Sequence, residues 1–190
     1  MEIAPGFTDN DWKRLTFRSK RDWIRAVAVL RWRLEERFVK PARKLLRLKR
    51  SGFAVLALDS LLVETLQQFR EGVPETPNRH SLQYFNAFLT SPYLGPGFDD
   101  QTATLFYLTI RCGILHQAEV KESSLVRRDR PLVSLSADRK GVVVNPVLFH
   151  NRVEAAFRSY LADLRKGTDG DLRRRFRDKM NHIARVRAGV

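Results

Sequence analysis

The chain of 190 residues is long enough for one domain with a sizeable core, and its 43% hydrophobic and 29% charged residues exclude a wholly disordered or collagen-like chain. The single cysteine, Cys112, cannot form an intrachain disulfide, and no apolar stretch reaches the roughly 20 residues that a membrane crossing requires. The net charge of +14 favours a polyanionic partner. We therefore expect a cytoplasmic protein that contacts no membrane.

Residues 11–48 have the spacing of a long amphipathic helix. Its apolar stripe consists of Trp23, Val27, Leu30, Leu34 and Phe38. Pro41 is expected to kink this helix or to restart it, because proline has no N–H and its ring clashes with the preceding turn. Ser51 and Gly52 then mark a break in the helical pattern.

Residues 53–69 are apolar nearly all round, which predicts the central and most buried helix. Helical spacing and capping signals predict further helices over residues 78–89, 101–120, 146–161 and 171–188.

The only strand signal comes from the alternating or β-branched residues on both sides of residues 138–141, which predict a small hairpin inserted at about 131–145. The sequence thus predicts one all-α domain over residues 1–190, a bundle of about six to seven helices with a single β-hairpin insertion.

Basic residues gather towards the two ends of the chain. Fifteen basic and four acidic residues give residues 11–50 a charge of +11, whereas two basic and six acidic residues give residues 51–100 a charge of −4. Eleven basic and five acidic residues give residues 151–190 a charge of +6. Basic terminal helices suit a nucleic-acid backbone, but a solvated surface or an acidic protein partner would also explain them.

The well-known catalytic spacings are absent from the sequence, which has no phosphate-loop glycine pattern, no HExxH, no paired CxxC and no GxSxG. The histidines are too scattered for a zinc site, so we expect neither a metal nor another cofactor, and we place His80, His150 and His182 at the surface. The notable pattern is Arg111 and His116, which interrupt an otherwise apolar helix.

This pair suits the cleavage of RNA by attack of a 2′-hydroxyl group. Histidine can transfer a proton near neutral pH, and an arginine stays charged and can clamp two phosphate oxygens. Five residues at about 100° each separate the two side chains by about 140° around an ideal helix. The long arginine side chain, a distortion at Gly113, or two copies of the motif meeting across a symmetric dimer would bring the groups together.

The string from Ile110 to Glu119, IRCGILHQAE, resembles the motif helix of the HEPN superfamily, whose members are helical bundles with an arginine and a histidine separated by four to six residues. The resemblance rests on this helix and on the bundle layout over about residues 20–165. It implies a metal-independent endoribonuclease that cuts single-stranded RNA at the interface of a homodimer. The implied setting is bacterial or phage defence, of the toxin–antitoxin, abortive-infection or CRISPR type, with an antitoxin or regulatory protein as a further partner.

By this resemblance, Arg111 positions and stabilises the scissile phosphate, and His116 acts as the general acid or base. Glu64, within the apolar run 61–66, is the natural carboxylate to hold Arg111, although the same ion pair would also explain a purely structural arginine. Cys112 and Gln117 are expected beside the pair. Because many active members carry a polar residue where Cys112 stands, the resemblance extends to members that bind RNA without cutting it.

A path for RNA is predicted along the basic residues that follow the motif helix and along the last helix. These residues would contact phosphates without recognising the base sequence. The alternative interpretation is that they only form a solvated surface. The candidates are Lys121, Arg127, Arg128 and Arg130 after the motif helix, and Arg173, Arg174, Arg175, Arg177 and Lys179 in the last helix.

Two other functions remain open at this point. The first is a non-catalytic helical module that binds RNA or a nucleotide, which would show salt-sensitive binding without cleavage. The second is a helical adaptor that docks an acidic protein, which would show tight protein binding without affinity for RNA.

Overall fold

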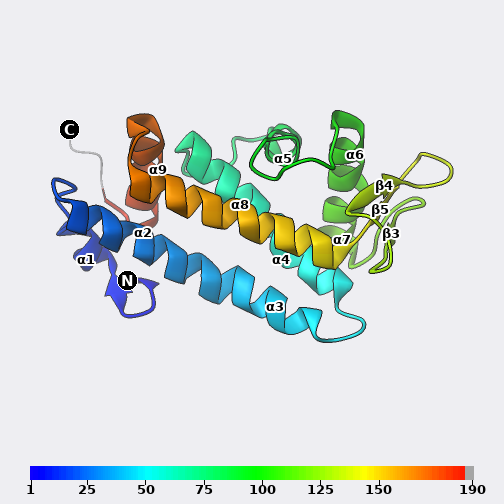
Figure 1. Ribbon diagram of the computed structural model, residues 1–190, viewed down its shortest axis with the longest axis horizontal. Coiled ribbons are helices and arrows are strands. Elements are labelled where there is room, and N and C mark those ends of the chain that lie inside the picture. The colour runs from blue at the N-terminus through cyan, green and yellow to red at the C-terminus, as the bar shows by residue number, and fades with distance from the viewer. Residues whose placement is uncertain (187–190) are drawn as a thin grey trace.

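A computed structural model describes residues 1–186 as a mainly helical bundle with small sheets at its edges (Figure 1). The helical segments are α1 (Asp9–Lys13), α2 (Lys20–Leu34), the π-turn η1 (Glu35–Val39), α3 (Lys40–Leu46), α4 (Gly52–Glu71), α5 (Ser81–Leu89), α6 (Asp100–Leu105), the π-turn η2 (Phe106–Arg111), α7 (Cys112–Gln117), α8 (Pro146–Lys166) and α9 (Gly170–Ile183). The strands are β1 (Glu2–Ala4), β2 (Phe7–Thr8), β3 (Leu125–Val126), β4 (Val133–Leu135) and β5 (Val142–Val144). The predicted mainly-α architecture is confirmed.

Helix α4 is the centre of the bundle, as its apolar sequence predicts. It contacts α3, α5, α8 and α9, and Figure 1 shows α8 and the α2–α3 helix running lengthwise beside it. The buried apolar side chains of α4 are Val55, Leu56, Leu62, Val63, Leu66 and Phe69. Each contributes about 1.5–3 kcal/mol of stabilisation through its burial, so this helix holds much of the core together.

The predicted helix over residues 11–48 is wrong at its N-terminal end. The chain forms the short helix α1, breaks where Phe17 adopts a left-handed conformation (φ +59°), and starts again at α2. Ser19 caps α2, because its Oγ accepts a hydrogen bond from the backbone N–H of Asp22 at 3.1 Å. The indole N–H of Trp12 donates to Asn181 at 2.8 Å and ties α1 to α9.

A new α-helix, α3, begins one residue before Pro41, as the predicted restart requires, but the chain stays helical from η1 into α3. The π-turn η1 precedes it, and the backbone N–H of Lys40 donates to the carbonyl of Glu35, five residues back. A wider turn relieves the clash between the proline ring and the preceding turn, and α3 continues directly from η1.

The predicted hairpin is present as β4 and β5, which pair antiparallel with Val133 opposite Val144 and Leu135 opposite Val142. Two further pairings were not predicted. Strand β3 pairs parallel with β5, and β1 and β2 form a second hairpin at the N-terminus. These strands contain only two or three residues, which is too few to show a two-residue period.

The last helix, predicted over residues 171–188, begins at Gly170 and ends at Ile183. Residues 187 and 188 of that prediction lie outside the described residues. Among residues 1–186 no helix is both long enough and apolar enough to cross a membrane.

Candidate functional site

Arg111 and Glu64 form an ion pair between the motif helix and the central helix. The Nη2 atom of Arg111, the last residue of η2, donates to Oε2 of Glu64 in α4 at 2.9 Å. The two side chains are only 15% and 14% exposed. Burial by itself would lower the pKa of Arg111, but the hydrogen bond and the charge of Glu64 outweigh it and raise the pKa. Arg111 is therefore held in place and firmly cationic.

The remaining nitrogens of this guanidinium group differ in their surroundings. Nε of Arg111 is buried and has no hydrogen-bond partner in the part of the chain that the structure describes. Its Cζ lies 5.2 Å from the ring centroid of Tyr107. Nη2 donates to Glu64, and within residues 1–186 no side-chain hydrogen bond is formed by Nη1. Such a group can still donate to a phosphate oxygen while the ion pair fixes its direction.

Glu64 is itself held by a chain of hydrogen bonds that reaches α9. The hydroxyl of Thr76 donates to Oε1 of Glu64 at 2.9 Å and accepts from Gln68 at 2.9 Å, and Lys179 donates to Gln68 at 2.8 Å. Fixed partners of this kind orient a functional side chain. Sequence reasoning found the Arg111–Glu64 contact but not this continuation.

The chain folds back over the motif helix where that helix ends. Ala118 takes a left-handed conformation (φ +55°), and the backbone N–H of Lys121 then donates to the carbonyl of Thr109 at 2.9 Å. A Cβ atom at Gly113 would lie 2.4 Å from the carbonyl oxygen of Glu119. Glycine is thus required at position 113 because the returning backbone passes against it.

His116 lies in the last turn of α7 and is exposed. No hydrogen bond joins its ring to another residue within the described part of the chain. Residues 112–117 are regular α-helix, so the five positions between Arg111 and His116 amount to about 140° of rotation. One copy of the chain therefore holds the arginine against α4 and presents the histidine elsewhere to solvent. Cys112 is half-buried beside Arg111, and Gln117 is exposed beside His116.

Several of the basic residues predicted to bind RNA are engaged within the protein. Arg128 donates to the carbonyls of Leu46 and Leu48 at 3.0 and 2.6 Å, which caps the end of α3. The Nε of Arg173 donates to the carbonyl of Leu164 at 3.0 Å, and its Cζ lies 4.3 Å from the ring centroid of Trp23.

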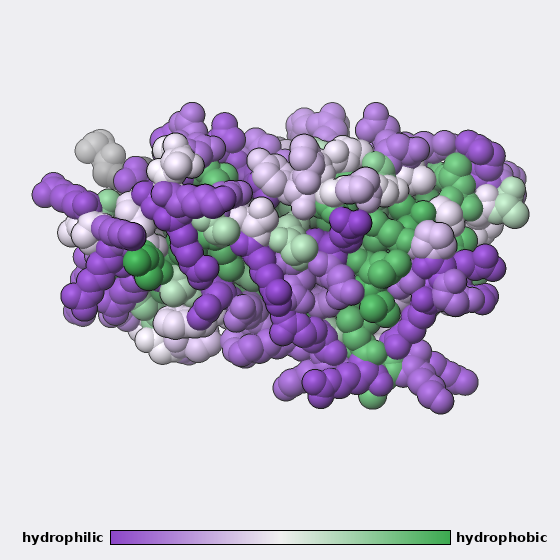
Figure 2. Space-filling model, in the orientation of Figure 1, coloured by the Kyte–Doolittle hydropathy of each residue, from purple (hydrophilic) through white to green (hydrophobic). Residues whose placement is uncertain are grey.

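The other basic candidates divide between surface and interior. Arg127 and Arg174 are exposed and pair with neighbouring aspartates, and Lys121 is half-buried beside Gly113. Hydrophilic side chains cover most of the face in Figure 2, whereas hydrophobic ones gather on its right half, over the N-terminal turns of α8. The prediction that Lys179 contacts a phosphate is wrong, because Lys179 is 6% exposed. Burial, with the charge of Arg33, lowers its pKa to about 8.

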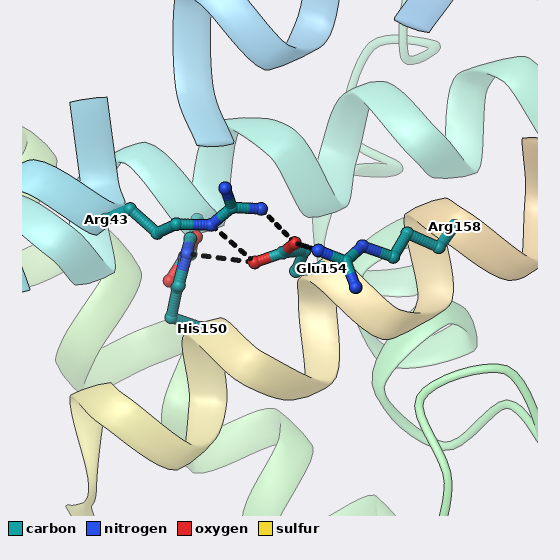
Figure 3. Close-up of polar contacts among 5 residues, drawn as sticks. Arg43, His150, Glu154 and Arg158 are labelled. Atoms are coloured by element: carbon teal, nitrogen blue, oxygen red, sulfur yellow. Dashed lines mark hydrogen bonds and ion pairs between the residues drawn. The ribbon is translucent and has the colours of Figure 1, made fainter. Parts of the chain in front are cut away.

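A second polar cluster, which sequence reasoning missed, lies inside the bundle between α3, α4 and α8 (Figure 3). His150 is 1% exposed, so its predicted place at the surface is wrong. Its Nδ1 lies 2.9 Å from Oδ1 of Asp59, and its Nε2 lies 3.7 Å from Oε2 of Glu154. Arg43 and Arg158 both donate to Glu154 from the protein surface, as the dashed lines in Figure 3 show.

The two carboxylates of this cluster differ in how their surroundings shift their pKa. Burial raises the pKa of Asp59, against the lowering effect of His150. Burial also acts to raise the pKa of Glu154, but the hydrogen bond from Arg43 and the charges of Arg158 and His150 outweigh it and lower that pKa. Because Asp59 and His150 are closed off from solvent, this cluster joins helices and offers no site for a substrate. Asp59, a carboxylate within the most apolar helix, was the signal in the sequence.

Among residues 1–186 no group of three or more His, Cys, Asp or Glu side chains is placed to hold a metal ion. Comparison with protein-family models, with curated proteins and with solved structures finds no match for the chain. The interpretation of the site therefore depends on its own residues and their geometry.

Proposed function

We propose that the protein is a metal-independent endoribonuclease of the HEPN type, which cuts single-stranded RNA with Arg111 and His116. The observation that carries this proposal is the ion pair between Arg111 and Glu64, because it fixes a cation on the helix that also presents an exposed histidine. The π-turn that ends at Arg111 adds support, since such turns are frequent at functional sites.

The reaction needs two proton transfers and one fixed positive charge. A base removes the proton of the 2′-hydroxyl, the resulting oxygen attacks phosphorus, and the 5′-oxygen leaves with a proton from an acid. The products are a 2′,3′-cyclic phosphate and a 5′-hydroxyl end. His116 would act as base or acid, and Arg111 would stabilise the charge that develops on the phosphate.

A homodimer would solve the geometrical problem that one helix presents. Arg111 and His116 of one copy lie about 140° apart around α7, so a composite site needs residues from two copies. Leu61 and Leu108 are exposed and lie three residues before Glu64 and Arg111 on the same helices. Exposed apolar side chains beside the pair are suited to a protein interface.

The second candidate is a protein that binds RNA without cutting it. The ion pair between Arg111 and Glu64 favours this candidate, because the same pair would serve a purely structural role equally well. The net charge of +14 supports RNA affinity in both cases, and an acidic antitoxin or regulatory protein would use the same surface.

The test is to incubate the purified protein, in EDTA, with a single-stranded RNA that contains every dinucleotide and to identify the ends of the products. The proposal predicts 2′,3′-cyclic phosphate ends, and no cleavage at a position whose 2′-hydroxyl is replaced by hydrogen. Retention of intact RNA that salt reverses would establish the non-catalytic candidate. Products with 3′-hydroxyl and 5′-phosphate ends would contradict the proposed chemistry.

A further inference from the structure

A polar pocket lies where α4, the segment after α5 and the start of α9 come together. Its volume is about 200 Å³. Polar and charged side chains predominate among its lining residues, which are Gln67, Arg70, Glu71, Ala87, Ser91, Tyr93, Asp169, Leu172 and Arg175. None of them is Arg111, His116 or Glu64, although Arg175 is one of the basic residues predicted to contact RNA.

Arg70 is the unusual residue of this pocket. It is 8% exposed, and its Nε and Nη2 atoms are buried without a hydrogen-bond partner among residues 1–186. Its guanidinium carbon lies 3.2 Å from the ring centroid of Tyr93 and 5.2 Å from that of Tyr160. Nearly every buried arginine in a folded protein pairs with a carboxylate, and within residues 1–186 none lies within salt-bridge distance of Arg70.

The two tyrosine rings compensate for the missing carboxylate only in part. They attract the cation through their faces, but within the described residues its buried Nε and Nη2 atoms still have no hydrogen-bond partner. Burial lowers the pKa of Arg70, and the tyrosines oppose that effect. The folded protein therefore keeps a desolvated positive charge that an anion in the pocket would neutralise.

The groups around Arg70 define which anion fits. Arg175 lines the same pocket, and its Nη1 donates to the backbone carbonyl of Arg70 at 3.2 Å, so two arginines border one cavity. The N-terminal turn of α9 also borders the pocket with its partly positive backbone N–H groups. Two guanidinium groups and a helix N-terminus suit a phosphate dianion.

The carboxylates of the pocket identify the rest of the ligand. One oxygen of Glu71 accepts from Gln67 at 3.0 Å, and one oxygen of Asp169 accepts from the backbone N–H of Leu172 at 2.9 Å. The other oxygen of each carboxylate accepts no hydrogen bond in the described part of the chain. Acceptors beside a phosphate site match the hydroxyl groups of a sugar, as acidic residues do for ribose in dinucleotide sites.

We infer that this pocket binds a sugar phosphate, with the phosphate on Arg70 and Arg175 and the sugar hydroxyls on Glu71 and Asp169. The ligand is a small phosphorylated sugar or the ribose phosphate of a nucleotide, which share this chemistry. The inference does not depend on the proposed ribonuclease activity, because Arg111 and His116 do not line this pocket.

The experiment is isothermal titration of the full-length protein with ribose 5-phosphate, adenosine 5′-monophosphate, inorganic phosphate and ribose in separate runs. Ribose 5-phosphate is expected to bind with a Kd below about 1 mM and at least about tenfold more tightly than inorganic phosphate. Ribose alone should not bind. Adenosine 5′-monophosphate binding more tightly than ribose 5-phosphate would identify the source as a nucleotide, and the reverse order would identify a free sugar phosphate.

Three variants make the result specific to the pocket. Arg70→Met keeps the length of the side chain and should weaken binding by at least about tenfold. Arg175→Met should weaken binding by a similar factor, and it changes an exposed residue and leaves the buried positions intact. Arg21→Met removes an exposed arginine of α2 that does not line the pocket, and it should leave binding unchanged. Three results would each overturn the inference: no binding at about 10 mM, wild-type affinity in the Arg70 and Arg175 variants, or ribose 5-phosphate binding no tighter than phosphate.

Discussion

Replacing Glu64 by glutamine tests how the ion pair holds Arg111. Glu64→Gln keeps the size of the side chain and can still accept the hydrogen bond from Thr76, so it removes the charge and little else. Breaking a fully buried pair costs about 3–5 kcal/mol. Because both side chains are about 15% exposed, water screens part of this loss, and we expect the free energy of unfolding to fall by about 2 kcal/mol.

A double-mutant cycle isolates the pair from other effects of each substitution. Arg111→Met removes the cation, and the variant with both changes should lose less than the sum of the single variants, with a coupling energy of about 1–2 kcal/mol. Glu36→Gln is the matched control, because Glu36 pairs with Lys40 at the exposed surface, and it should change stability by less than about 0.5 kcal/mol.

The assay is urea denaturation at pH 7, followed by far-ultraviolet circular dichroism. If Glu64→Gln were as stable as the wild type, or if the two single effects simply added, Arg111 would not be held by Glu64. The preorganised cation on which the proposed site depends would then be lost.

Three further predictions concern other parts of the structure. Burial holds the pKa of Lys179 at about 8, against an ordinary value of 10.5, so the unfolded chain binds more protons between these values. Between pH 7 and pH 10 the wild type should therefore gain about 2 kcal/mol of stability relative to Lys179→Met, and a flat difference would contradict this. Gly113→Ala should lower the free energy of unfolding by about 1–3 kcal/mol, because the new Cβ meets the carbonyl of Glu119. It should also speed amide hydrogen exchange in the segment that folds back after Ala118, and unchanged exchange would count against this prediction. Asp59→Leu should lower the free energy of unfolding by about 3 kcal/mol, because it leaves His150 buried without its partner. Adding His150→Leu should restore part of that loss, and two additive losses in thermal unfolding would refute the coupling.

The helices and the core of this protein could be predicted from its sequence because they depend on the spacing of apolar residues. Helix α4 is apolar nearly all round and is central, and the hairpin β4–β5 has β-branched residues on both sides of a turn. The π-turns could not be predicted, because they arise from local fits such as that around Pro41, and apolar spacing does not report them. The break at Phe17 depends on a single left-handed residue and was also missed.

The candidate site was predictable to the extent that a single residue stood out from its surroundings. Glu64 interrupts an apolar helix, and the structure places it against Arg111 as expected. His150 was missed because sequence alone does not show that it faces Asp59, which lies 91 residues earlier in the chain. Lys179 was misplaced because a lysine in a basic helix resembles its exposed neighbours until the packing against α4 is known.

The most direct test of the proposed function is the rate at which the purified protein cuts single-stranded RNA in EDTA, measured for the wild type, His116→Ala and His182→Ala. His182 is exposed like His116 but lies in the last turn of α9, so its replacement controls for the loss of a surface histidine. The proposed function predicts that His116→Ala lowers the rate by at least about 100-fold and that His182→Ala leaves it unchanged. Equal rates for all three proteins, or no cleavage by the wild type, would contradict it.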